Sequence, residues 1–262
     1  MSQPVAIVTG SAGSLGGTIA DTLFEAGYAV VGYDLPAAVR RLADGRSLPD
    51  RVTIPGDVTS AGDLADLVEH VDATYGRLDL LVNNAATDAK VTGSAGEPVD
   101  PVDAFSRFAA DAFLRTLETN VVGPFLVVQA CLDLLRRTPR ANIVNIASIY
   151  GLRAPNHALY RDSGTNLFKS PDYPASKAAL ISFTEYLAAT LGQVGIRANA
   201  VSPGGVDLGL PQAFVDEYSK GTPLSRMASP EDVAAAVLFV GSADAGYLTG
   251  HNLVVDGGRT IW

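Results

Sequence analysis

Two side chains that could transfer a proton lie four positions apart, Tyr173 and Lys177, in the stretch Tyr-Pro-Ala-Ser-Lys. On a helix, positions four apart share one face, so the lysine ammonium could act on the phenol. A free tyrosine has a pKa of about 10 and is a poor base near neutral pH. A neighbouring positive charge stabilises the phenolate, and Tyr173 could then exchange a proton with a substrate hydroxyl or carbonyl. The four-residue spacing could also be accidental, so the role of this pair is inferred from the other motifs of the chain.

A glycine-rich turn follows the first apolar run of the chain. The run Val5–Val8 leads into Thr-Gly-Ser-Ala-Gly-Ser-Leu-Gly-Gly, and helical periodicity continues to Phe24. In such a strand-turn-helix unit, backbone amides can approach a pyrophosphate and the helix N-terminus adds partial positive charge. The residues expected to bind a dinucleotide there are Gly10, Ser14, Leu15 and Gly16.

The second predicted strand, Ala29–Tyr33, ends at Asp34, about twenty residues beyond the glycines. A carboxylate at this place can accept hydrogen bonds from the adenosine ribose of NAD and would repel the extra phosphate of NADP. We therefore expect NAD(H) to be preferred over NADP(H), although Arg40 and Arg41 lie on the following helix. Asp34 could instead cap that helix.

Further strand patterns alternate with helical ones along the chain. The predicted strands are Val52–Ile54, Leu78–Val82, Asn142–Ile146, Arg197–Val201 and Asn252–Val255. A helix is predicted over Ser60–Tyr75, and a capping box at Ser229 and Asp232 predicts another helix start. This alternation requires a parallel sheet with helices on both faces. We predict one α/β domain over residues 1–262, a Rossmann-type doubly wound sheet.

Ligands of open parallel sheets bind outside the carboxyl ends of the strands. Residues that follow predicted strands are therefore candidates for the cleft, namely Asp57 near the adenine edge with Val58, Asn84 with Ala85, and Ser148. The helical pattern Phe105–Arg137 contains Asn120 and is expected to bend at Gly123-Pro124. The Gly-, Pro- and Asp-rich stretch 87–103 is interpreted as a loop at the cleft rim.

Composition limits the partners. The net charge of −9 and the pI near 4.7 argue against a nucleic-acid or anionic-membrane surface, so a small-molecule substrate is expected. The single cysteine, Cys131, excludes an intrachain disulfide and is expected to pack in the core. No metal site is expected. No apolar run approaches the ~18–20 residues that span a bilayer and no signal peptide precedes the first strand, so we expect a cytoplasmic protein.

Taken together, these residues resemble the classical short-chain dehydrogenase/reductase family over Val5 to Gly258. The matching features are the Thr9–Gly16 turn, Asn83-Asn84-Ala85, Asn120, Ser148, Tyr173 with Lys177, Pro203-Gly204, Ser229 to Asp232 and Asp256-Gly257-Gly258. The resemblance implies a hydride-transfer enzyme that acts on CH–OH groups, usually as a homotetramer, with a dimer also open.

The resemblance also implies a role for each member of a Ser-Tyr-Lys-Asn tetrad. Tyr173 would be the acid/base, and Lys177 would lower its pKa and bind the nicotinamide ribose. Ser148 would hydrogen-bond the reacting oxygen, and Asn120 would hold a water that connects Lys177 to solvent. The implied cofactor contacts, besides those already named, include Tyr173, Lys177, Pro203, Gly204 and Val206.

Three departures from the family pattern stand out. Ser14 replaces a glycine, which leaves the Gly-x-x-Gly-x-x-Gly spacing of longer members that modify nucleotide sugars, so a sugar-nucleotide epimerase is a remote alternative. Leu208 stands where a threonine near the nicotinamide amide is common. Ser148 and Tyr173 are 25 positions apart, much farther than is usual.

The additional segment, about 153–172, must loop out beside the catalytic groups because both of its ends are held there. Its polar candidates for substrate contacts, with Ser148, are Tyr160, Arg161 and Asn166, and also Asn156, His157 and Lys169. This content favours a hydroxylated or anionic substrate over an apolar one, and further substrate loops are expected near 87–104 and 205–227. The loops and the terminal Asp-Gly-Gly-x-x-x-Trp are similar to a subgroup associated with bacterial surface-sugar modification.

The sequence therefore predicts an NAD(H)-dependent oxidoreductase that interconverts a secondary alcohol and a ketone in a polar or sugar-like substrate. A 3-oxoacyl thioester reductase is an alternative, although such an enzyme would more naturally use NADPH. An NAD(H)-sensing or scaffold protein without catalysis is an alternative of another class.

Overall fold

The computed structural model describes residues 3–43, 52–88, 90–92, 99–164 and 167–262. Its main sheet has parallel strands in the order β3-β2-β1-β4-β6-β8-β9. The strands are β1 (Val5–Thr9), β2 (Ala29–Asp34), β3 (Val52–Pro55), β4 (Leu80–Asn83), β6 (Asn142–Ile146), β8 (Arg197–Pro203) and β9 (Asn252–Val255). The strand order reverses between β1 and β4, which is where such sheets bind ligands. The predicted fold class is confirmed.

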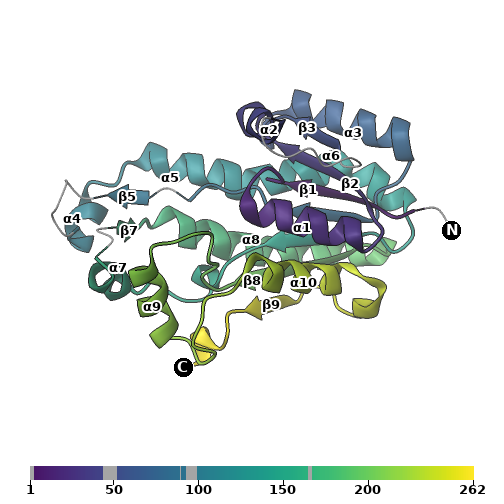
Figure 1. The fold of residues 1–262 in the computed structure, drawn as a ribbon. Helices are drawn as coiled ribbons and strands as arrows, with labels where there is room; N and C mark the ends of the chain where they lie inside the picture. Colours follow the sequence, from purple (N-terminus) through teal and green to yellow (C-terminus); the bar gives the residue numbers. More distant parts are fainter. Residues whose placement is uncertain (1–2, 44–51, 89, 93–98, 165–166) are drawn as a thin grey trace.

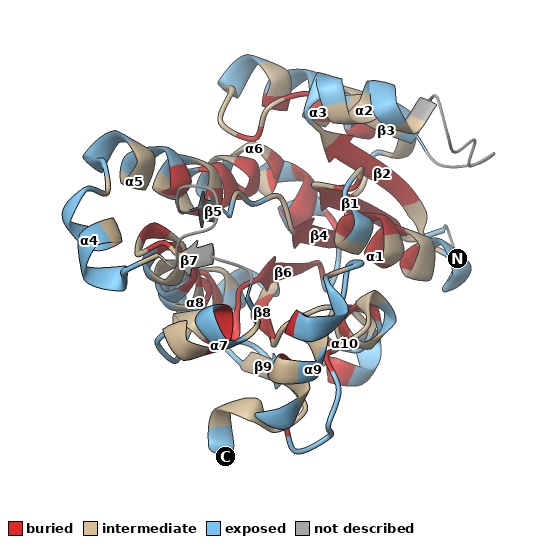
Figure 2. Ribbon diagram, turned by 60° about the vertical axis from the view of Figure 1, so that its left-hand side comes forward, coloured by how far each residue is buried: buried red, intermediate tan, exposed pale blue. Residues whose placement is uncertain are grey.

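Helices cover both faces of this sheet (Figure 1). They are α1 (Ser14–Glu25), α2 (Pro36–Ala43), α3 (Ala61–Tyr75), α5 (Ala110–Leu117), α6 (Gly123–Arg137), α8 (Asp172–Leu191) and α10 (Pro230–Gly241). Successive strand residues point to opposite faces. Ala6 and Val8 therefore pack with α1 and α10, and Val5 and Ile7 pack with α3 and α6. Figure 2 shows the central strands fully buried between these layers.

Short helical turns complete the main domain: η2 (Ile149–Gly151), η3 (Gly192–Val194), η4 (Ala243–Ala245) and η5 (Arg259–Ile261). Helix starts follow local side-chain chemistry. The Ser60 hydroxyl accepts from the Asp63 amide at the start of α3. At α10, Ser229 and Asp232 form the predicted capping box around Pro230, which confirms that prediction.

The long helical pattern is interrupted earlier than expected. A π-helical turn, η1 (Glu118–Val122), joins α5 to α6, whereas the predicted bend was at Gly123-Pro124. Pro124 explains the position, because it has no N–H to donate to the carbonyl four residues before it, that of Asn120. The proline thus distorts the turn on its N-terminal side.

Cys131 lies on α6 and is fully buried in the core, and burial raises its pKa to about 12, so the predicted packing role is confirmed. By length and composition alone, Ala110–Arg137 could cross a membrane, although charged residues interrupt its apolar pattern. This observation carries little weight, because the apolar face with Val127, Cys131 and Leu135 packs in the core of the domain.

Two segments expected to be loops contain regular structure. They hold β5 (Lys90–Thr92), α4 (Pro101–Ser106), α7 (His157–Asp162) and β7 (Leu167–Lys169). β5 and β7 pair antiparallel as a separate small sheet, with Val91 opposite Phe168. The interpretation of 87–103 and 153–172 as loops is wrong in this respect. Strands of three residues are too short to show alternation in the sequence, which is why they were not predicted.

The small sheet, α4 and α7 lie together at one end of the molecule (Figure 1). There α7 packs on α9 (Gln212–Lys220), with Leu159 and Tyr160 against Phe214 and Tyr218. The additional segment is therefore folded onto the C-terminal part of the chain instead of looping out freely.

Candidate active site

The predicted acid/base residues come together at the carboxyl edge of β6. Ser148 follows that strand and caps η2, where its hydroxyl accepts from the Tyr150 amide at 3.1 Å. Tyr173 lies in the first turn of α8, and the nearby Ser148 side chain opposes the rise in the pKa of its phenol. The 25-residue separation in sequence therefore does not separate the two hydroxyl groups in space.

Close packing holds this turn against α8. A Cβ on Gly151 would lie 2.8 Å from the carbonyl carbon of Lys177, so only glycine allows η2 to approach the helix backbone. Lys177 is 2% exposed, and its Nζ donates to the carbonyl of Ile146, the last residue of β6, at 2.7 Å. Strand, turn and helix are thus locked together around the predicted catalytic groups.

The pKa shifts of Tyr173 and Lys177 differ from the prediction that Lys177 lowers the Tyr173 pKa. Burial raises the pKa of Tyr173, the Asp88 carboxylate raises it further, and the hydrogen bond with Ser148 opposes the increase. Burial lowers the pKa of Lys177 to about 8, with Asp88 acting in the opposite direction and Lys169 reinforcing the decrease. The Lys177 Nζ is 5.6 Å from the Tyr173 ring centroid and is directed to Ile146. The predicted lowering of the Tyr173 pKa by Lys177 is therefore not seen in this geometry.

Asn120 is buried within the π-helical turn, and its side chain anchors the chain after β4. Its Oδ1 accepts from the Thr87 amide at 2.8 Å, and its Nδ2 donates to the Thr87 carbonyl at 2.9 Å and to Ser176 Oγ at 3.0 Å. Ser176 in turn donates to the Tyr173 carbonyl at 2.8 Å. The side chain thus positions the first turn of α8, and the water-holding role implied for Asn120 stays a prediction.

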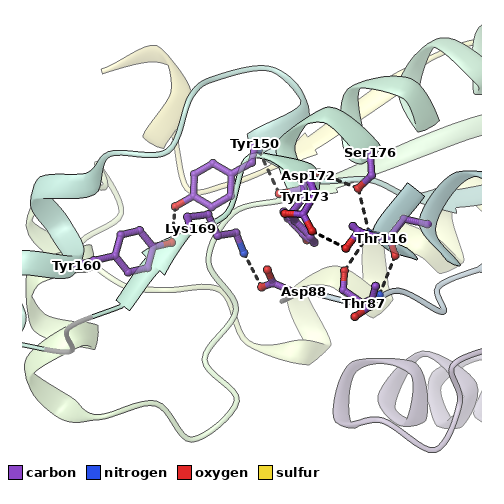
Figure 3. A network of polar contacts seen from close by, with 11 residues as sticks. Thr87, Asp88, Thr116, Tyr150, Tyr160, Lys169, Asp172, Tyr173 and Ser176 are labelled. Atoms are coloured by element: carbon purple, nitrogen blue, oxygen red, sulfur yellow. Dashed lines mark hydrogen bonds and ion pairs between the residues drawn. The ribbon is translucent and has the colours of Figure 1, made fainter. Parts of the chain in front are cut away.

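A second buried contact fixes the start of α8 and has no signal in the sequence. Asp172 precedes Tyr173, is fully buried, and accepts from the Thr116 hydroxyl on α5 at 2.5 Å. Figure 3 shows this contact beside the Tyr173 side chain. Sequence reasoning missed it because Thr116 and Asp172 are far apart along the chain.

The glycine turn is shaped to leave backbone amides open. Gly10 has φ of 69°, and a Cβ on Gly16 would lie 2.1 Å from the Gly10 carbonyl oxygen. Helix α1 begins after Gly13 with no side chain capping its first amides. Thr9 accepts from the Asn84 and Ala85 amides at 3.0 Å each, which brings the end of β4 beside the turn. An uncapped helix start in a glycine turn fits a pyrophosphate.

The Asp34 carboxylate lies against this turn. Its two oxygens accept from the Ala12 amide at 2.8 Å and from the Leu35 amide at 2.7 Å. It does not accept from the first turn of α2, where the Ala38 amide bonds to the Leu35 carbonyl instead. The helix-cap alternative is therefore wrong, and the carboxylate stands at the end of β2 where an adenosine ribose would lie.

The other predicted cofactor residues also lie at the carboxyl edge. The Asp57 carboxylate accepts from the Thr59 amide and hydroxyl, and Val58 is buried in the core. Pro203 ends β8, the Gly204 amide donates to the Val255 carbonyl, and Val206 forms a bridge to Ala228. The set fits a nicotinamide dinucleotide laid across the ends of the strands, with Ser14 and Leu15 in the uncapped first turn of α1.

The predicted substrate residues of the additional segment lie in different surroundings. The Tyr160 hydroxyl is 3.1 Å from that of Tyr150. Arg161 is 66% exposed and pairs with its neighbour Asp162. Asn166 lies outside the described residues. Sequence reasoning missed Tyr150 and Asp88, which sit beside Tyr173 with Lys169 (Figure 3). Within the described ranges, no cluster of three or more His, Cys, Asp or Glu could hold a metal ion.

Comparison with known proteins gives consistent likenesses. The family model described as enoyl-(acyl carrier protein) reductase matches residues 10–260. An uncharacterised short-chain type dehydrogenase/reductase of Sinorhizobium fredii is 34% identical over 97% of this chain, which spans only 43% of that relative. The L-fucose dehydrogenase of Bos taurus is 33% identical over 98% of this chain and 89% of its own length. A Leptospira borgpetersenii short-chain dehydrogenase solved with bound NAD⁺ has a TM-score of 0.83 and 25% identity, covering 99% of this chain and 94% of that one.

Proposed function

The chain belongs to the short-chain dehydrogenase/reductase family and is an oxidoreductase acting on CH–OH groups, and from this we propose that it interconverts a secondary alcohol and a ketone with NAD(H). The observation that carries the proposal is the convergence of Ser148, Tyr173 and the buried Lys177 at the carboxyl edge of β6. Two hydroxyl groups converging on one point can hold one substrate oxygen between them.

In the oxidative direction, Tyr173 in its phenolate form takes the proton of the substrate hydroxyl, while Ser148 donates a hydrogen bond to the same oxygen. The bound nicotinamide supplies the hydride acceptor, or the hydride donor in the reverse reaction. Lys177 lies near the phenol as a buried cation held by the Ile146 carbonyl, and its role in stabilising the phenolate stays part of the proposal. Asn120 and Ser176 hold the helix turn that carries Tyr173.

The preference for NAD(H) over NADP(H) is part of the proposal. It is supported by Asp34, whose carboxylate is held by the Ala12 and Leu35 amides at the end of β2. A fixed negative charge there accepts ribose hydroxyl groups and repels a 2′-phosphate.

The proposed substrate is polar or sugar-like. This is supported by the polar groups around Tyr173, among them Asp88, Lys169 and Tyr150, and by the likeness to L-fucose dehydrogenase. The narrower likeness to enzymes of bacterial surface-sugar modification rests on the loop after Asn84, the additional segment and the C-terminal motif. We further propose a cytoplasmic homo-oligomer, a dimer or tetramer, which cell fractionation and light scattering of the purified protein would test.

A 3-oxoacyl thioester reductase is the second candidate, favoured by the description of the matching family model. One assay separates the two. The purified protein is mixed with NAD⁺, NADP⁺ or their reduced forms and a panel of sugars, polyols and β-keto thioesters, and the reduced-nicotinamide absorbance is followed. We expect turnover of polyhydroxylated alcohols with NAD⁺. Turnover confined to thioesters with NADPH would replace our proposal with the second one.

A further inference from the structure

An ion pair outside the proposed catalytic set lies over the face of Tyr173. Lys169 Nζ is 2.5 Å from Asp88 Oδ2, 3.9 Å from the Tyr173 ring centroid and 5.4 Å from that of Tyr150. Asp88 lies shortly after β4, and Lys169 is the last residue of β7. The pair therefore joins the two segments that carry the small β5–β7 sheet. Figure 3 shows Lys169 between Tyr150 and Asp88, on the side of Tyr173.

This pair differs from the ordinary surface ion pairs of the chain. Surface pairs contribute little, because water screens both charges. Arg161–Asp162 is of that kind, with both side chains about half exposed or more. By contrast, the Lys169 side chain is 12% exposed and its ammonium lies on aromatic rings, while Asp88 keeps 38% exposure. The ammonium is thus partly desolvated and held in direction, and the carboxylate still reaches solvent.

The two groups present complementary hydrogen-bonding chemistry at one place. A carboxylate only accepts, with room for several donors, and an ammonium only donates. A hydroxyl group does both, so two adjacent hydroxyl groups match such a pair. Tyr173 holds the reacting oxygen in the proposed function, and Lys169 lies on its ring. The groups that Asp88 and Lys169 can reach are therefore those close to the reacting carbon.

We propose that Asp88 and Lys169 form a substrate-binding pair that holds hydroxyl groups next to the reacting carbon, so that the enzyme selects sugars or cyclic polyols over simple alcohols. This inference rests on the proposed dehydrogenase function and names its substrate class. An alcohol without neighbouring hydroxyl groups displaces water from the ion pair without replacing the hydrogen bonds of that water, which lowers its reactivity. An anionic substrate is disfavoured, because the Asp88 carboxylate belongs to the same pair.

The test compares cis-cyclohexane-1,2-diol with cyclohexanol, which differ only in the neighbouring hydroxyl group, as substrates with NAD⁺. The variants are Asp88→Asn and Lys169→Gln. The matched control is Asp72→Asn, which removes a cross-element ion pair with Arg137 of 2.9 Å between α3 and α6. We expect the kcat/KM ratio of the diol to cyclohexanol to fall about tenfold or more in both variants, and the same ratio to stay close to the wild-type value in the control variant. Binding of L-fucose to the protein with NADH, measured by calorimetry, should weaken in parallel.

An equal loss of kcat/KM for the diol and for cyclohexanol would show that the Asp88–Lys169 pair only holds together the two segments that carry β5 and β7. That result would overturn the proposal. So would an unchanged diol rate, or a hydroxycyclohexane carboxylate that outperforms the diol and improves in Asp88→Asn. If the wild-type protein oxidises no alcohol, the dehydrogenase proposal fails. Calorimetry of L-fucose binding then still tests whether Asp88 and Lys169 bind hydroxyl groups. Weaker L-fucose binding in both variants would support the pair, whereas absent or unchanged binding would overturn it.

Discussion

Replacing Lys177 by methionine should stabilise the protein while removing its activity. The Lys177 ammonium is buried, and burial lowers its pKa from 10.5 to about 8. At about 1.4 kcal/mol per pKa unit, keeping this charge at pH 7 costs roughly 3 kcal/mol of folding free energy. Methionine of similar length removes that cost but leaves the Ile146 carbonyl without its donor, a loss of about 1 kcal/mol or somewhat more. The expected net gain at pH 7 is therefore about 1–2 kcal/mol.

The pH dependence of this gain distinguishes desolvation from other causes. The folded pKa of Lys177 lies below its unfolded value, so the unfolded chain binds more protons between pH 8 and 10.5. Wild-type stability from this group consequently rises as the pH increases through that window, and the advantage of methionine shrinks. Relative to pH 7, the advantage should fall by about 2 kcal/mol at pH 9.5.

Urea unfolding of wild type and Lys177→Met at pH 7 and pH 9.5 measures both quantities, and initial rates with NAD⁺ measure the loss of turnover. A variant that is less stable at pH 7, or a stability difference that does not change with pH, would refute the electrostatic reasoning. Lys177→Arg is the matched control, because it keeps a charge that does not titrate in this range. Its stability relative to wild type should fall as the pH rises.

Substitutions at three further positions, Tyr173, Asp34 and Gly16, test the remaining parts of the site. Tyr173→Phe should lower turnover by about 10²–10⁴ while NADH binding, followed by fluorescence, changes little; appreciable residual activity would contradict the acid/base role. Asp34→Gly should raise the kcat/KM ratio of NADP⁺ to NAD⁺ by about tenfold, and Asp34→Asn should do so less if anchoring of the Ala12 amide matters; an unchanged ratio in both would assign the selectivity elsewhere. Gly16→Ala should destabilise the fold by about 1–3 kcal/mol and weaken NADH binding, since its Cβ would meet the Gly10 carbonyl, whereas Gly192→Ala, with open space around it, should do neither.

Local patterns made most of the fold predictable. Strands such as Val5–Thr9 and Asn142–Ile146 are buried on both faces, so their sequences are short, mainly apolar runs bounded by turn residues. The capping box at Ser229 and Asp232 and the four-residue spacing of Tyr173 and Lys177 also depend only on near neighbours. Short-range chemistry of this kind is visible in a single sequence.

Contacts between distant segments were not predictable in the same way. The β5–β7 pairing joins strands of three residues each, too short for a period to emerge. Asp88 and Lys169 are 81 positions apart, and no local feature of either residue indicates the other. The π-helical turn at Asn120 could not be predicted without its contact to Thr87, because Pro124 alone predicts only a distortion nearby.

The additional segment surrounds Tyr173, and apart from Asp172 at its end the contacts that hold Tyr173 come from other parts of the chain. Ser148 is fixed by η2, and Gly151 lets that turn rest directly on the Lys177 backbone, so the proton-transfer groups are positioned before the segment begins and after it ends. The segment itself is tied to other parts of the chain, through β5 and through α9. Substrate recognition by Asp88 and Lys169 can therefore vary while the Ser148–Tyr173 pair keeps its geometry, which is why their substitution should alter the choice of substrate more than the chemistry of transfer.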